Sequence, residues 1–123
     1  MYSVEIKETS TELTKKQKIA IKDTTDCIKL DEATAENALI IKPVAYAVLA
    51  VHNDKAENPD YDLYVVVADD GQKYVTGSKS FFSSFMIIYE EMYDVEDEDW
   101  SIKIFRSPSK NYKGKDFITC SIF

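Results

Sequence analysis

The sequence predicts a single, mainly β domain that contains one long helix. Short runs between residues 43 and 122 are rich in β-branched and aromatic residues, whereas one stretch near residues 78–93 has apolar residues at helical spacing. At 123 residues the chain is long enough for one domain with its own core. We expect residues 43–123 to form that core and residues 1–42 to extend it with further strands.

Three strands open the core region. Residues 44–51 and 63–67 are apolar, β-rich runs separated by the polar connection 53–60. The pair Asp70-Gly71 that follows is typical of a tight hairpin, because glycine tolerates the positive φ that such turns require. Residues 73–76 are therefore expected to return as a third strand.

A helix and two more strands complete the core region. Ser78 is a suitable N-cap, and the helix predicted over 78–93 has its apolar stripe at Phe81, Phe85, Ile88 and Met92. Residues 100–105 and 116–122 are expected to be strands. The resulting order, β-β-β-α-β-β, is used by the five-stranded OB-fold barrel, whose oligonucleotide site includes the loop between strands four and five. We therefore predict an OB-fold-like barrel, although other small α+β folds share this order.

The N-terminal third is less regular. Apolar residues alternate at 4–6 and again at 19–21, and 39–41 is apolar throughout. This pattern favours short strands over a long helix. The polar stretch 9–18 is expected to form an arm.

The cysteine and apolar content excludes several classes of protein. Cys27 and Cys120 lie far apart and the chain has one histidine, so zinc or haem ligation is not expected, and no cofactor or metal is predicted. We expect two free thiols, with Cys120 buried. The longest apolar run, Val44–Val51, is too short to cross a bilayer, and the N-terminus lacks signal-peptide character, so a cytoplasmic location is expected.

Charge is distributed unevenly along the chain. Residues 101–123 hold five basic residues and one acidic residue, net +4, so the net charge of −7 leaves −11 for residues 1–100. The basic residues surround Tyr112 in the loop 106–115, and Phe105 and Phe117 flank that loop. Cations seek phosphates and exposed rings stack on bases, so the region is predicted to bind single-stranded nucleic acid.

Strand parity extends this predicted site. If Val65, Val75 and Ile104 face inward, the neighbouring aromatic residues on their strands face outward. The predicted nucleic-acid-binding residues are Tyr64, Tyr74, Lys103, Phe105, Arg106, Lys110, Tyr112, Lys113, Lys115 and Phe117. The alternatives are that the rings cover the barrel or line a dimer interface and that the basic loop is a solvated turn.

Catalysis has little support in the sequence. Neither a nucleophile-elbow motif nor a phosphate-binding P-loop motif is present, and His52 has no evident nucleophile or metal partner. We predict that the protein is not an enzyme. The acidic run 90–99 is expected to be a solvated surface or, alternatively, a site that recruits a basic partner.

Two segments give the chain a family resemblance. Residues 73–78 with Phe81 and Phe82, and above all Pro108-Ser-Lys-Asn-Tyr-Lys-Gly-Lys-Asp-Phe-Ile-Thr-Cys120, resemble bacteriophage-encoded single-stranded DNA-binding proteins, roughly over residues 40–123. The resemblance implies an OB-type barrel that coats single strands during phage DNA replication or recombination in the bacterial host cytoplasm. The implied partners are single-stranded DNA and phage or host replication and recombination proteins, and homo-oligomer formation is left open.

A competing function comes from the acidic charge. Net −11 over the first hundred residues also suits an acidic DNA mimic or interaction protein that inhibits a host defence system or nuclease. The basic loop 106–115 discriminates between the two hypotheses, because a DNA mimic does not need it.

Overall fold

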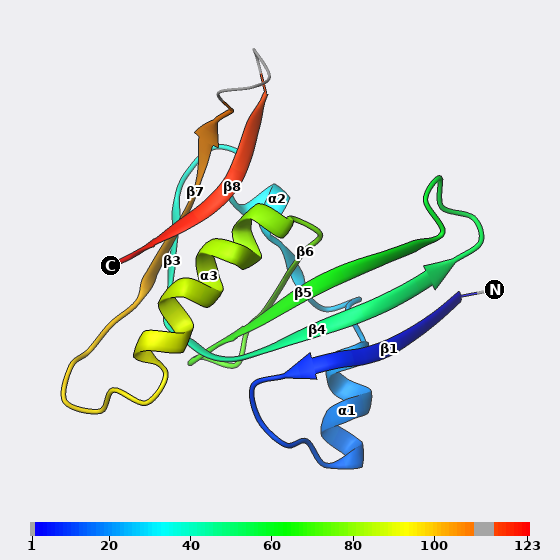
Figure 1. Cartoon of the computed structure of the whole chain (residues 1–123), viewed down its shortest axis with the longest axis horizontal. Helices are drawn as coiled ribbons and strands as arrows, with labels where there is room; N and C mark the ends of the chain where they lie inside the picture. The colour runs from blue at the N-terminus through cyan, green and yellow to red at the C-terminus, as the bar shows by residue number, and fades with distance from the viewer. Residues whose placement is uncertain (1, 110–114) are drawn as a thin grey trace.

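The computed structural model describes residues 2–109 and 115–123 and arranges their strands in two sheets (Figure 1). Across the five-stranded sheet the strands follow the order β1 (Tyr2–Thr9), β4 (Pro43–Asn53), β5 (Asp60–Ala68), β6 (Lys73–Thr76) and β2 (Ile28–Lys29). The three-stranded sheet contains β3 (Leu39–Ile41), β7 (Ile102–Pro108) and β8 (Asp116–Ile122). Neighbouring strands are antiparallel except β2 and β6. The fold is thus mainly β, as predicted.

In the described part of the chain, three helices accompany the sheets: α1 (Lys15–Lys22), α2 (Leu30–Ala33) and α3 (Lys79–Met92). The predicted helix over 78–93 is confirmed by α3, and its predicted cap is also confirmed, because the Ser78 hydroxyl accepts a hydrogen bond from the backbone N–H of Phe81 at 3.2 Å. The hairpin between β5 and β6 is confirmed too, with Gly71 at φ +87°. No helix in the described ranges is long and apolar enough to cross a membrane.

The predicted order β-β-β-α-β-β from residue 43 onward is confirmed, but the prediction that these strands close into a barrel is wrong. The N-terminal strands explain the difference. Strand β1 pairs with the edge of β4 that β5 leaves open, and β3 pairs with the edge of β7 that β8 leaves open. The strands that closure would have joined to each other are therefore already paired.

The prediction of a strand at residues 19–21 is also wrong, because this segment belongs to α1. The helix begins after a capping box: Thr14 Oγ1 accepts from the N–H of Gln17, and the Gln17 side chain accepts from the N–H of Thr14. Ile21 is buried against the five-stranded sheet, whereas Ile19 is 72% exposed.

The five-stranded sheet is buried on both faces. One face packs with α3 and the three-stranded sheet around fully buried residues that include Phe81, Phe85, Ile102 and Ile104. The smaller cluster on the other face contains Ile21, Ala47, Leu49, Val65 and Val75. Side chains on both sides of β4 and β5 therefore lie in a core.

Helix α3 lies along β8, one of the two edge strands of the three-stranded sheet (Figure 1). The Ser80 hydroxyl donates to the backbone carbonyl of Ile118 at 3.1 Å, and the hydroxyls of Ser84 and Thr119 are hydrogen-bonded at 2.9 Å. The helix is thus attached to β8 by polar contacts as well as by the core.

Both cysteines are free thiols, as predicted. Cys120 lies on β8 in the larger core, and burial raises the pKa of its thiol to about 12. Cys27 is half-buried, and burial likewise raises its pKa.

Candidate nucleic-acid interface

Phe105 and Phe117 lie on the same outer face of the three-stranded sheet. The register pairs Phe105 with Thr119 and Ser107 with Phe117, so the two phenylalanines are diagonal neighbours across β7 and β8. Phe105 is half-buried and Phe117 is 39% exposed, whereas Ile104, on the opposite face of β7, is fully buried. The prediction that both rings face away from the core is confirmed.

Lys103 and Ile40 continue this surface. Lys103 is exposed and lies two residues before Phe105 on β7, hence on the same face. Ile40 pairs with Lys103 from the neighbouring strand β3 and is 49% exposed. We refer to Ile40, Lys103, Phe105 and Phe117 as the outer sheet face. It offers two aromatic rings and one ammonium group that has no ion-pair partner among residues 2–109 and 115–123.

Arg106 lies on the opposite side of β7 from these residues. Its guanidinium donates to the backbone carbonyl of Asp31 in α2 and to the carboxylate of Asp116 at 3.1 Å. These contacts tie the β7–β8 hairpin to α2 and engage two of the five guanidinium N–H donors, while the Nε donor is buried. The prediction of Arg106 as a phosphate-binding cation beside the rings therefore changes to a structural role.

Tyr64 and Tyr74 are buried, and the prediction that they face outward is wrong. Tyr64 stacks on Phe82 of α3 with ring centroids 4.4 Å apart and planes 12° apart. Tyr74 belongs to the larger core, and burial raises the pKa of its phenol. Alternation along a strand separates its two faces, but here α3 and the second sheet cover the face that was expected to be free.

The basic loop is described in part. The backbone N–H of Ser109 donates to the carbonyl of Lys115 at 3.0 Å, so the two ends of the loop lie together, and Lys115 is exposed. The predicted site residues Lys110, Tyr112 and Lys113 lie outside the described residues.

The sequence interpretation missed a second basic surface, on α1. Four of its eight residues are exposed lysines: Lys15, Lys16, Lys18 and Lys22. The capping box from Thr14 to Gln17 could have identified the helix, because this spacing is typical of a helix start. The alternation of Ile19 and Ile21 favoured a strand instead.

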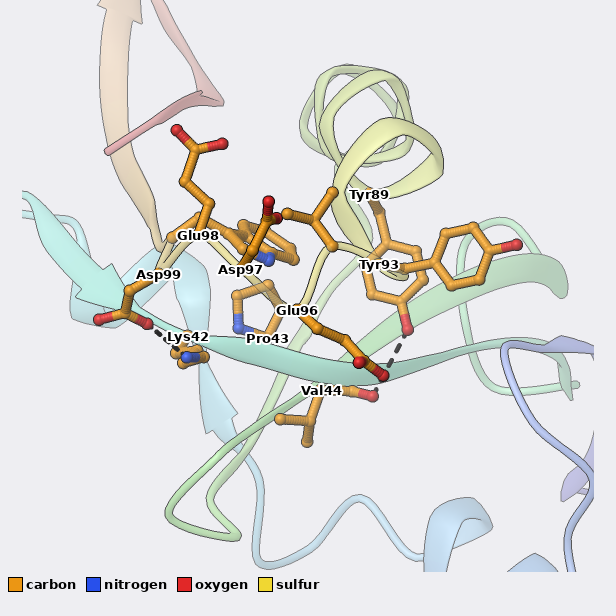
Figure 2. Close-up of a pocket in the computed structure, with 11 residues that line it drawn as sticks. Lys42, Pro43, Val44, Tyr89, Tyr93, Glu96, Asp97, Glu98 and Asp99 are labelled. Atoms are coloured by element: carbon orange, nitrogen blue, oxygen red, sulfur yellow. Dashed lines mark hydrogen bonds and ion pairs between the residues drawn. The ribbon is translucent and has the colours of Figure 1, made fainter.

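The segment between α3 and β7 forms an acidic pocket, defined by Pro43, Tyr89, Tyr93, Trp100 and the run Glu96–Asp99 (Figure 2). The Tyr89 hydroxyl donates to the carbonyl of Val44 at 3.4 Å. The Asp99 carboxylate is ion-paired with Lys42, which raises the pKa of Lys42 and lowers that of Asp99, whereas Glu98 points away from this pair (Figure 2). The acidic pocket is lined by four carboxylates and one cation, so it repels phosphates and suits a cationic group.

His52 lies between two carboxylates at the end of β4. Its Nδ1 is 2.7 Å from Asp60 Oδ1, and its Nε2 is bonded to Asp54. The hydrogen bond to Asp60, followed by that to Asp54, raises the pKa of His52. Within residues 2–109 and 115–123, no cluster of three or more histidine, cysteine, aspartate or glutamate side chains is arranged to hold a metal ion.

Comparison of the chain with protein-family models, curated proteins and solved structures found no significant match.

Proposed function

We propose that the protein binds single-stranded DNA without sequence specificity, through the outer sheet face and the basic loop that follows it. The observation that supports this most is the diagonal pair Phe105 and Phe117 on an exposed sheet face, with Lys103 on the same face. The rings offer a surface on which bases stack, and the lysines of 103–115 offer charge to the phosphates.

The chemistry of this face favours single strands over duplex. Every base has a π-face, so stacking on a phenylalanine accepts any sequence, but a paired base inside a duplex cannot reach the ring without unstacking. Each stacked base contributes about 1–3 kcal/mol to binding. A closed barrel is not required, because open sheets with exposed rings also bind single strands.

The role that follows is the coating of single strands in phage DNA replication or recombination, in the host cytoplasm. No step of that role needs catalysis by this chain. Phage or host replication and recombination proteins are the partners that such a role implies. The OB-type barrel implied by the resemblance is not needed for this proposal.

Binding is tested by titrating a fluorescent dT oligonucleotide with the protein, with and without unlabelled duplex competitor. We expect Phe105→Leu or Phe117→Leu to weaken binding by about 1–3 kcal/mol without changing the dependence on salt. Lys103→Gln is expected to lower the slope of log affinity against log salt by roughly 0.7. Lys55→Gln, at an exposed lysine in the β4–β5 connection, is the matched control and leaves both quantities unchanged.

Thermal melts first establish that each variant is folded. Equal or tighter binding to duplex in the competition contradicts the proposal. So does unchanged affinity in both phenylalanine variants, because the outer sheet face would then not contact the strand.

The second candidate function is an acidic DNA mimic or interaction protein that inhibits a host defence system or nuclease. The acidic pocket favours it, because four carboxylates line it together with exposed Tyr93, whose ring can pack against the apolar part of a basic residue. Two results together would establish this function instead. The wild-type protein binds no oligonucleotide but inhibits a nuclease, and the Glu96→Gln/Asp97→Asn variant loses that inhibition.

A further inference from the structure

Helix α1 concentrates positive charge in a chain whose net charge is −7. Half of its residues are lysines, it contains no acidic residue, and all four lysines are exposed. None of the four forms an ion pair or a side-chain hydrogen bond with another described residue. Their ammonium groups are therefore available to an external anion.

This charge does not stabilise the helix. Lys15 and Lys18, and Lys18 and Lys22, are three and four residues apart, where like charges repel each other. Lys15 and Lys16 also lie in the first turn, next to the positive end of the helix dipole, where acidic residues are favourable. Of the four, only Lys22 lies in the last turn, where a cation is favourable.

Another residue already supplies the cation at the C-terminal end of α1. Lys73 of β6 donates to the backbone carbonyls of Ala20 and Asp23 at 2.8 and 3.0 Å and is ion-paired with Asp26. The lysines of α1 are thus not needed to complete the helix end. Their repulsion costs stability that an anion bound along the helix would restore.

The lysines form one stripe with an apolar residue inside it. Lys15, Lys18 and Lys22 repeat at helical spacing, and Ile19, 72% exposed, lies four residues after Lys15 and three before Lys22. Ile21, which is buried, anchors the helix to the sheet. The anchored side turns the exposed stripe toward solvent. Lys18 and Lys22 also line a groove that they share with Glu5 and Glu12.

We propose that α1 is a second phosphate-binding surface for single-stranded DNA, separate from the outer sheet face. The inference rests on the proposed function. Lysine ammonium groups contact phosphates as point charges and read no sequence, which suits non-specific binding. Ile19 within the stripe offers an apolar contact to a sugar or base.

Because of the position of α1, the length of the bound DNA strand can show whether α1 contributes to binding. The helix lies beside β1 and β4, whereas the β7–β8 hairpin extends from another part of the molecule (Figure 1). A short oligonucleotide bound at the outer sheet face does not reach α1. A longer strand can contact both surfaces, so α1 adds affinity to long strands alone.

The experiment compares wild type with a Lys15→Gln/Lys18→Gln/Lys22→Gln variant, in which glutamine preserves helix propensity. Affinity is measured across a salt series for dT oligonucleotides of about 6 and about 30 nucleotides, which lie within and well above the span of roughly 4–16 nucleotides typical of one single-strand site. For the longer strand we expect the salt slope to fall by about 2 and affinity at 0.1 M salt to fall on the order of 100-fold, from about 0.7 per lost contact. For the shorter strand we expect no change.

Two controls accompany this comparison. Arginine at the same three positions keeps the charge and is expected to keep the affinity for the longer strand. This variant distinguishes an effect of lost charge from an effect of altered helix stability. Lys55→Gln removes one exposed lysine elsewhere and is expected to leave the salt slope unchanged.

Several outcomes overturn the inference. Unchanged affinity of the glutamine variant for the longer strand does so, and so does an equal loss for both lengths, which would reflect the overall charge. Self-association of the wild type without DNA that the glutamine variant abolishes would assign α1 to the acidic surface of a second copy. A wild type that binds neither oligonucleotide contradicts the proposed function itself, whereas a binding wild type with an unaffected variant contradicts this inference alone.

Discussion

Replacing Phe85 with alanine tests the central packing of the fold. Phe85 is fully buried in α3, and its ring centroid lies 5.3 Å from that of Tyr89, 5.8 Å from Phe81 and 5.9 Å from Tyr46. The ring therefore joins the helix to β4 of the five-stranded sheet as well as to its neighbours along α3. Its removal leaves a cavity between two layers that are each held by other contacts, so the cavity cannot fully collapse.

The expected loss is about 3–5 kcal/mol in the free energy of unfolding, which is typical of a fully buried phenylalanine. A domain of this size has a total stability of roughly 6–18 kcal/mol, so the variant loses a large part of it. The melting temperature is expected to fall by about 10–20 °C. Urea denaturation followed by tryptophan fluorescence gives the free energy directly, because Trp100 lies in the same core.

Ile87→Ala is the matched control, because Ile87 lies two residues further along α3 and is 72% exposed. Its effect on stability is expected to remain within about 0.5 kcal/mol. A loss below about 1.5 kcal/mol for Phe85→Ala, or equal losses in the two variants, would refute the assignment of Phe85 to the core.

Three further predictions concern single residues. The hydrogen bond to Asp60 raises the pKa of His52 in the folded protein. The contribution of His52 to stability is therefore complete below its unfolded pKa of about 6.5 and is lost as pH rises through the folded pKa. The urea midpoint, measured from about pH 5 to 9, is expected to fall over this range in wild type and not in His52→Gln. The Cys120 thiol, buried and with its pKa raised to about 12, is expected to react with a disulfide reagent more slowly than half-buried Cys27, and equal rates would contradict its burial. Gly71→Ala forces a side chain to adopt φ +87° with open space around it, so backbone strain alone should cost about 1–2 kcal/mol in urea denaturation.

The strands and helix after residue 43 could be predicted because local patterns determine them. Ser78 caps α3, Gly71 permits the hairpin, and the apolar residues of β7 and β8 alternate. Their outward rings Phe105 and Phe117 were predicted correctly for the same reason, since the larger core occupies the other side of this sheet. Helix α3 reaches the outer face at Thr119, through the hydroxyl of Ser84. Ile122 continues the alternation on β8 but is 54% exposed, so the pattern does not hold to the end of the strand.

The pairing of the strands and the packing of other elements over the sheet faces could not be predicted, because both depend on residues distant in sequence. Parity on β5 and β6 correctly places Tyr64 and Tyr74 opposite Val65 and Val75, yet both faces of the sheet are buried. Only the position of α3 over that face decides that Tyr64 stacks on Phe82 rather than on a ligand. The same applies to the barrel, since β1 and β3 occupy the strand edges that closure requires.

Helix α3 also covers the edge of β8, where another chain could otherwise add a strand. An outermost strand carries unpaired backbone groups that can template pairing with another chain, which leads to aggregation. On β8 the Ser80 hydroxyl occupies the carbonyl of Ile118, and the helix itself obstructs the approach of a foreign strand along that edge. Damage to the first turn of α3 is therefore more harmful than its loss of stability alone suggests, because it uncovers a strand edge in a molecule that is still largely folded. The amphipathic helix that completes the core thus also shields one strand edge from pairing with another chain.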